Sequence, residues 1–253
     1  MNVSLYQAAA GLSASARWQE LISENLAASS VPGYKKQDLS FDAIQGGTIS
    51  QGGVGTNSLS HYLLASPTAS INFQQGEVKS TGVPTDVAIE GNGFFAVQLP
   101  GGETGYTRDG EFHINAQGQL VNKSGSLVLG DSGPIQFDAN NPAPITISST
   151  GEVSQGTDLK GKLKLVGFND VQLLTPTGQN CFLAKNPKLL PDDATSTSKL
   201  RQGFVETANS SPVVEMAHLI TAMRNFESNQ RVIQMQDDRM GRTIAEFGST
   251  SGG

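Results

Sequence analysis

The sequence predicts a mainly β central domain, built from short antiparallel strands in a sandwich or barrel-like arrangement, with a long α-helix at each end of the chain. Residues 3–30 contain no proline and one glycine and are rich in Ala, Leu, Gln and Glu, which favour a helix. From about 71 to 205, short β-type runs alternate with Gly, Asp, Asn or Pro at regular intervals, which indicates an all-β fold rather than βαβ units. Residues 213–247 return to a helical pattern.

The N-terminal helix carries an apolar seam of period 3.5, because its candidate packing positions alternate in steps of three and four. Several of these positions are small or polar, so the seam is thin. The helix is expected to end before Pro32, since the residue before a proline disfavours the helical conformation, and Gly33 follows. The candidate packing residues on this helix are Leu5, Leu12, Ile22 and Leu26.

The C-terminal helix is expected to begin with Ser211 as the N-cap and Pro212 in the first turn, with Glu215 placed favourably for the helix dipole. At 1.5 Å per residue it would extend for roughly 50 Å. A helix of that length outreaches the β domain, so both helices are expected to pair with each other or with neighbouring molecules. Packing of both helices onto a compact monomer is the alternative. The candidate packing residues are Met216, Leu219, Met223, Phe226, Ile233 and Met240.

Three regions follow from these patterns. Residues 1–30 and 206–253 are expected to form a terminal helical domain, residues 31–75 a linker or extended arm, and residues 76–205 the β-rich body. Within the arm, the glycine-rich stretch 46–60 is predicted to be a loop or linker. In the body, hairpin turns are predicted at 108–111 and 116–119.

Composition excludes several classes of protein. The formal net charge of −6 argues against nucleic-acid binding, which needs basic residues to contact phosphates. No run of 18 apolar residues is present, so no membrane span is expected. The N-terminus lacks the basic and apolar regions of a secretory signal peptide. The single cysteine, Cys181, lies in an apolar run and is interpreted as a buried strand residue.

Catalytic, cofactor-binding and metal-binding residues are not expected. The three histidines lie in three different regions, with no carboxylate or cysteine at the spacing of metal ligands. Residues 91–96 imitate a dinucleotide-binding fingerprint, but the chain continues as a strand where that fingerprint needs a helix. A β-rich enzyme or carbohydrate-binding module would need a cleft lined with aromatic residues, and the chain has one Trp, Trp18, and four Tyr.

Four blocks of residues, in order along the chain, resemble the bacterial flagellar rod and hook (axial) protein family. The N-terminal block ends in Asn-Leu-Ala followed by a Pro-Gly-Tyr-Lys turn, and the mid-chain block contains Asp-Val-Ala-Ile-Glu-Gly-Asn-Gly-Phe-Phe. The third block combines the short segments 106–110 and 118–121, and the last block spans 203–227. The residues that match the family motif are Asn25, Leu26, Ala27, Pro32, Gly33, Asp86, Gly91, Gly93, Glu206 and Glu215.

The resemblance implies a structural subunit with no cofactor and no enzymatic activity. It implies assembly with copies of itself and with neighbouring rod subunits, and export by the flagellar export apparatus through its secretion channel. It also implies that the terminal helices line this channel in the periplasm-spanning rod of the basal body, with the β domain outside. Segment 133–166 resembles the proximal-rod member more than the distal-rod member; a distal-rod or hook-type subunit is the alternative within the family.

Overall fold

A computed structural model describes residues 3–50, 59–138, 141–194 and 198–250. The chain divides into two compact units. The first, called the helical unit below, comprises residues 1–27, 37–70 and 212–253. The second, called the body, comprises residues 28–36 and 71–211.

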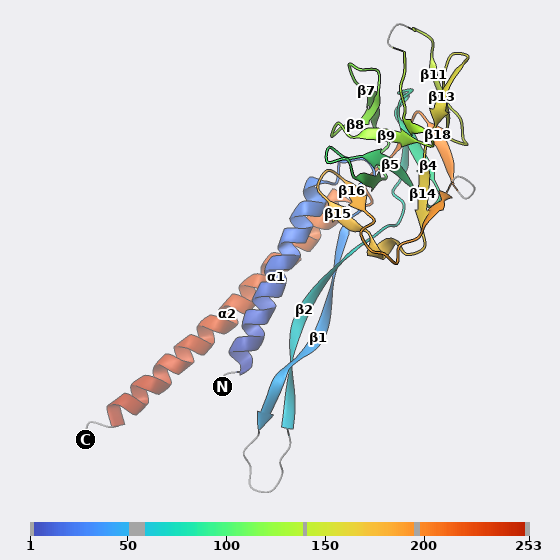
Figure 1. The fold of residues 1–253 in the computed structure, drawn as a ribbon. Coiled ribbons are helices and arrows are strands. Elements are labelled where there is room, and N and C mark those ends of the chain that lie inside the picture. The colour runs from blue at the N-terminus through green and yellow to red at the C-terminus, as the bar shows by residue number, and fades with distance from the viewer. Residues whose placement is uncertain (1–2, 51–58, 139–140, 195–197, 251–253) are drawn as a thin grey trace. The chain divides into compact units, whose positions relative to one another are not determined.

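The helical unit contains the predicted helix from each end of the chain. Helix α1 spans Val3–Ala27 and ends shortly before Pro32, as predicted. Helix α2 spans Pro212–Thr250 and begins at the proline expected in its first turn. Figure 1 shows α1 running beside the first part of α2, and the two helices are in contact. In the described part of the chain, neither helix combines the length and hydropathy that crossing a bilayer requires.

A two-stranded ribbon completes the helical unit. Strand β1 spans Gln37–Ser50 and strand β2 spans Leu59–Ile71, and the two strands pair with each other. The prediction of a loop over 46–60 is therefore wrong for residues 46–50 and 59–60, which are strand, while residues 51–58 lie outside the described residues. Strand-forming Thr48 and Ile49 follow the two glycines, and pairing with β2 satisfies the backbone groups that a free loop would leave to water.

The body is built almost entirely from short strands, as predicted. Ten of those described form one sheet whose main path runs β15-β16-β6-β5-β9-β8-β7, with β10, β14 and β17 attached. A three-stranded sheet follows the order β11-β12-β13, and β18 pairs with β4 and β19 with β3. Every pairing described in the body is antiparallel.

The bounds of the body strands are β3 Val78–Ser80, β4 Val87–Glu90, β5 Phe94–Gln98, β6 Thr104–Thr107, β7 Phe112–Ile114, β8 Leu120–Asn122, β9 Leu127–Gly130, β10 Gly133–Pro134, β11 Ile145–Ile147, β12 Glu152–Gln155, β13 Asp158–Lys162, β14 Leu165–Phe168, β15 Thr175–Thr177, β16 Cys181–Leu183, β17 Pro191–Asp193, β18 Lys199–Gln202 and β19 Phe204–Glu206. A short 3₁₀ helix, η1, spans Val171–Leu173.

The core of the body lies on the inner faces of these strands. Val87, Phe95 and Val128 are fully buried within one apolar cluster, and a second cluster gathers around Phe94. Cys181 is buried in strand β16, as predicted, and burial raises the pKa of its thiol to about 11. A thiol with that pKa stays protonated near neutral pH, so the residue packs as a small apolar side chain.

One predicted hairpin turn is confirmed and the other is wrong. Residues 116–119 close the turn between β7 and β8, where the Gly118 N–H donates to the Asn115 carbonyl. Residues 108–111 do not join a pair of strands, because β6 pairs with β5 and β16 whereas β7 pairs with β8. Arg108 and Asp109 are instead buried, and the Gly110 carbonyl accepts a hydrogen bond from Val87. Long-range contacts therefore decide the conformation of this Asp-Gly sequence.

Candidate packing surface and the body junction

Helices α1 and α2 pack closely because small residues of α1 meet α2. The Cα of Gly11 lies so near Asn229 that an added Cβ would be 3.1 Å from its Nδ2 atom. Asn229 Nδ2 donates a hydrogen bond to Ser15 Oγ at 3.4 Å. Further along, the rings of Trp18 and His218 lie 6.5 Å apart. Residue numbers fall along α1 as they rise along α2, so the two helices are antiparallel.

The structure places the predicted packing residues on different faces. In α1, Ile22 is buried, Leu12 and Leu26 are half-buried, and the side chain of Leu5 lies outside the described set. In α2, Leu219, Phe226 and Ile233 are half-buried, whereas Met216, Met223 and Met240 are exposed. Most of the least exposed positions of α2 recur in steps of four and three, namely Glu215, Leu219, Ala222, Phe226, Asn229, Ile233 and Gln236, and Val232 is half-buried beside them.

The single seam predicted for α2 therefore combines residues from two neighbouring faces. Ala222 was not among the predicted packing residues, and Glu215 was predicted only as a dipole and motif residue, although both are buried. A small residue and a carboxylate carry little hydrophobic signal, whereas the exposed methionines carry a strong one. The seven-residue spacing was visible in the sequence, but both faces share it, so it could not show which face packs on α1 and which is exposed.

The outward face of α2 carries a stripe of large apolar side chains. Val213, Met216, Ile220 and Met223 are each more than half exposed and recur in steps of three, four and three. Met235, Met240 and Ile244 are exposed further along the same helix. Scattered apolar residues are ordinary on protein surfaces, but a group at helical spacing marks an interaction site. We call the stripe formed by residues 213, 216, 220 and 223 the outer stripe.

Asn25 fastens the start of the ribbon to α1 within the helical unit. Its Nδ2 donates to the Gln37 carbonyl at 2.8 Å, and its Oδ1 accepts from the Gln37 N–H at 2.9 Å. The side-chain amide thus pairs with the backbone of Gln37 as a neighbouring strand would. Leu26 and Ala27, the next two motif residues, form the last turn of α1, where Leu26 is half-buried and Ala27 is exposed.

Glu215 lies buried in the first turn of α2, beside a cavity of about 270 Å³ that is also lined by Trp18, Ile22 and Asn25. Its Oε2 lies 3.8 Å from Nδ1 of His218, one turn along the helix. The positive end of the helix dipole favours a carboxylate at this position, as expected from the sequence.

A buried ionic cluster lies in the body where the chain leaves for the helical unit. Glu206 is at the end of β19, and its carboxylate pairs with the ammonium of Lys35 and, at 3.3 Å, with Nη1 of Arg108. The side chains of Lys35, Arg108 and Glu206 are at most 5% exposed. The Gly76 N–H donates to the same carboxylate at 2.9 Å, so one acidic side chain collects three donors.

Two cations share a single carboxylate in this cluster, and backbone carbonyls solvate the excess positive charge. Lys35 Nζ donates to the Gln74 carbonyl at 2.7 Å, and Arg108 Nη2 donates to the Gly91 carbonyl at 2.9 Å. Burial lowers the pKa of Lys35 and of Arg108, and attraction to Glu206 opposes that shift in both. A buried charge of this kind is costly unless paired, so each cation depends on Glu206.

The remaining motif residues shape the backbone around this cluster. Gly33 has a φ of +66°, and an added Cβ would lie 2.3 Å from the Arg108 backbone, so only glycine fits. The Pro32 carbonyl accepts a hydrogen bond from Asn180. Asp86 closes a turn by accepting from the Thr81 hydroxyl at 2.6 Å, and burial raises its pKa. Gly93 lies against Ala194.

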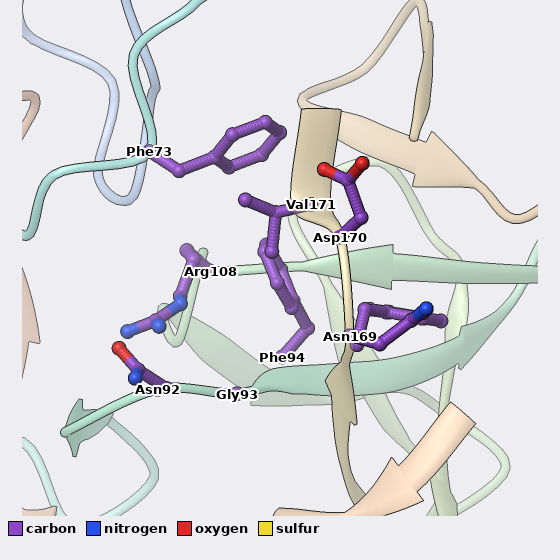
Figure 2. Close-up of a pocket in the computed structure, with 9 residues that line it drawn as sticks. Phe73, Asn92, Gly93, Phe94, Arg108, Asn169, Asp170 and Val171 are labelled. Atoms are coloured by element: carbon purple, nitrogen blue, oxygen red, sulfur yellow. The ribbon is translucent and has the colours of Figure 1, made fainter. Parts of the chain in front are cut away.

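A second feature of the body is a pocket of about 290 Å³, whose lining includes Phe73, Phe94, Arg108 and Asp170 (Figure 2). Its phenyl rings contact one another, since the Phe73 and Phe94 centroids lie 5.9 Å apart in an edge-on arrangement. Arg108, the lining cation, has its guanidinium engaged by Glu206 and Gly91. The phenyl rings belong to the second apolar cluster of the body, whereas Asn92, Asn169 and Asp170 at the rim are exposed. Among the described residues, no group of three His, Cys, Asp or Glu side chains could hold a metal ion.

Comparison with known proteins finds flagellar rod and hook proteins as relatives over most of the chain. The model for the flagellar hook protein FlgE/F/G D1 domain matches residues 88–155, and that for the flagellar basal-body rod FlgEFG protein C-terminal region matches residues 201–246. The flagellar basal-body rod protein FlgG of Buchnera aphidicola subsp. Baizongia pistaciae is 33% identical, over 95% of this chain and 98% of the relative. The chain belongs to the flagellar basal-body rod protein family.

Two further rod proteins match at similar identity. FlgF of Caulobacter vibrioides is 33% identical over 87% of this chain and 86% of the relative. FlgF of Mesorhizobium japonicum is 31% identical over 99% of this chain and 100% of the relative. The family resemblance predicted from the motifs is confirmed. The rod protein is a structural axial subunit located in the flagellar basal body. Because relatives of both kinds match equally well, identity does not distinguish the position within the rod.

Proposed function

We propose that this rod protein polymerises, with copies of itself and with neighbouring rod subunits, into a hollow shaft that transmits torque from the motor to the hook. In this proposal α1 and α2 form a coiled-coil-like inner layer around the export channel, and the body forms the outer layer. The subunit reaches its place through the flagellar export apparatus.

The outer stripe of α2 is the observation that supports this proposal. Its four residues are at least half exposed, so the helix presents one face to α1 and a second, neighbouring apolar face to solvent. Exposed apolar area favours association, at roughly 25 cal/mol per Å² removed from water. A neighbouring subunit's helix, laid along the stripe, would cover it at the heptad spacing that helix pairs use.

Met223→Asp tests the proposal at the centre of the outer stripe. The side chain is exposed in the single subunit, so the change should leave the folded monomer intact and place an unpaired charge in the assembled interface. A buried unpaired charge costs several kcal/mol. We expect normal levels of protein, rods that stall during assembly, and loss of swimming, measured by motility and by electron microscopy of isolated basal bodies.

Glu227→Gln is the matched control, because it removes a charge one turn further along α2 at an exposed position. It should change swimming little. Normal motility with Met223→Asp would remove the outer stripe from the subunit interface. Phe226→Asp is less specific, since Phe226 also lies on the face that packs on α1.

The position within the rod is part of the same proposal. The likeness of segment 133–166 to the proximal-rod member favours a place near the motor rather than near the hook. Rods isolated from assembly-arrested strains separate the two positions: a proximal subunit is present in the shortest rods, and a distal one is missing from them.

A further inference from the structure

The chain passes between the helical unit and the body at four places, after residues 27, 36, 70 and 211. Three body segments adjoin these crossings: 28–36, 71–77 and 206–211. Force that passes along the chain from the helices to the body enters through these segments. How firmly each segment is bound to the body therefore bears on how that force is passed on.

All three segments meet at two side chains. The Glu206 carboxylate binds the ammonium of Lys35 and the N–H of Gly76, and its backbone carbonyl accepts from the Gly33 N–H at 2.7 Å. Glu206 thereby links segments 28–36 and 71–77 to its own segment, 206–211. Arg108, the residue directly after β6, links the same carboxylate to the main sheet.

Asn209, three residues after Glu206, also binds the first two segments. Its Oδ1 accepts from the Lys36 N–H at 2.8 Å, and its Nδ2 donates to the carbonyls of Asn72 at 2.7 Å and Gln74 at 3.0 Å. Its own N–H donates to the Tyr34 carbonyl. The oxygen and the amide nitrogen of this side chain therefore both form hydrogen bonds with the backbone of the first two segments.

We infer that Glu206 and Asn209 form an anchoring hub that fastens all four chain crossings to the body, so that force passed along the chain from the helices reaches the β-sheet through buried and half-buried polar contacts rather than through flexible linkers. This inference rests on the proposed function for its mechanical part. Its structural part, the fastening itself, concerns the isolated subunit and stands apart from assembly.

Glu206→Gln in the full chain tests the fastening. The substitution keeps the size of the side chain but removes the charge that compensates Lys35 and Arg108. Amide hydrogen exchange should rise about tenfold or more at Gly76, whose N–H binds the carboxylate, because a charge-assisted hydrogen bond is weakened. Exchange should also rise at Gly33 and Lys36, while the core amide of Leu120, bonded to Ile135, stays protected.

Asn209→Ala is the second variant, because Glu206→Gln leaves buried cations unpaired and can unfold the whole body. Asn209 is only half-buried and uncharged, so its loss should open the segments at 33–36 and 72–76 without exposing the core. The matched controls are Glu90→Gln, which breaks an exposed pair with Arg201, and Asn169→Ala, which removes comparable side-chain bonds to backbone at an exposed loop. Neither control should alter exchange at the three segments.

The mechanical part is tested by swimming in medium of raised viscosity. Cells with Asn209→Ala should assemble flagella yet lose speed more steeply with viscosity than cells with Asn169→Ala. Unchanged exchange at Gly33, Lys36 and Gly76 in both hub variants would overturn the inference, as would faster exchange with an unchanged response to viscosity. Failure of the proposed function is a different result, namely the absence of the wild-type protein from isolated rods.

Discussion

The two units of the molecule bury their apolar residues in opposite ways. In the body, large side chains such as Phe95 and Leu120 are fully buried, and antiparallel strands surround them. In the helical unit, α2 leaves Val213, Met235 and Ile244 more than 60% exposed. A closed core makes a domain stable by itself, whereas exposed apolar side chains at helical spacing gain stability only when another surface covers them. The body thus covers its large apolar side chains with its own strands, whereas the helical unit leaves part of its apolar surface uncovered in the single chain.

Phe95→Ala is expected to have the largest effect on this comparison. The ring is fully buried and contacts Phe112 edge-on at 5.0 Å, so its removal leaves a cavity in the closed core. The free energy of unfolding of the body should fall by about 3–5 kcal/mol. Chemical denaturation followed by the β signal in circular dichroism measures this loss.

Phe41→Ala is the matched change in the helical unit. Phe41 is about half exposed and meets Trp18 edge-on at 6.2 Å, so only about 0.5–1.5 kcal/mol should be lost. Trp18 is the only tryptophan of the chain, so its fluorescence reports this unit separately. If Phe41→Ala and Phe95→Ala lowered the free energy of unfolding equally, the helical unit would have a closed core of its own, and the two units would not differ as described.

The sequence predicted best what depends on local chemistry. Helix α1 ends shortly before Pro32, α2 begins at Pro212, and Gly118 lies in a real hairpin turn, because proline and glycine act on backbone angles close to their own position. The turn predicted at 108–111 failed for the opposite reason. Arg108 is drawn into the body by Glu206, a residue 98 positions away, and no local pattern announces such a contact.

In the candidate site, too, the sequence identified local features but not long-range contacts. Glu206 and Asn25 were identified only as motif residues, and their partners became visible in the structure. The bond between Lys35 and Glu206 joins residues 171 positions apart. Periodicity found that α2 is amphipathic, but it could not separate the face that packs on α1 from the outer stripe, because Leu219 and Met223 are equally apolar and only the fold decides which is covered.

Asp109 should make the stability of the body, but not that of the helical unit, depend on pH. This is the second largest effect that we expect. Burial in the body raises the pKa of this carboxyl from 3.8 to about 6, and Glu111 and Asp86 add to the shift against the opposing influence of the Glu111 N–H and Lys123. The folded state therefore holds the proton more tightly than the unfolded state. Its contribution to stability is complete below pH 3.8 and is lost as pH rises through about 6, by at most about 3 kcal/mol.

Asp109→Asn should flatten that part of the pH profile. The amide oxygen of Asn can still accept the Glu111 N–H, and the variant carries no charge to desolvate. We expect the body of the variant to be more stable than wild type at pH 7 and nearly equal at pH 4, measured by denaturant titration at both values. The Trp18 signal of the helical unit should not follow this profile, and a parallel shift of that signal would show that the two units unfold as one.

Asn25→Asp is expected to have a local effect, and it tests whether the helical unit has any fixed structure before assembly. The buried amide pairs with both backbone groups of Gln37, and an aspartate keeps the acceptor but turns a carboxylate oxygen toward the Gln37 carbonyl. Losing the donor and adding repulsion should cost about 1–3 kcal/mol locally and speed amide exchange at Gln37 by about tenfold or more. Glu24→Gln, an exposed neighbour that also contacts Gln37, should leave that exchange unchanged. If the Gln37 amide already exchanges as fast in wild type as in the variant, the start of the ribbon is not fastened to α1 in the free subunit, and the difference between the two units is larger than the structure of the single chain suggests.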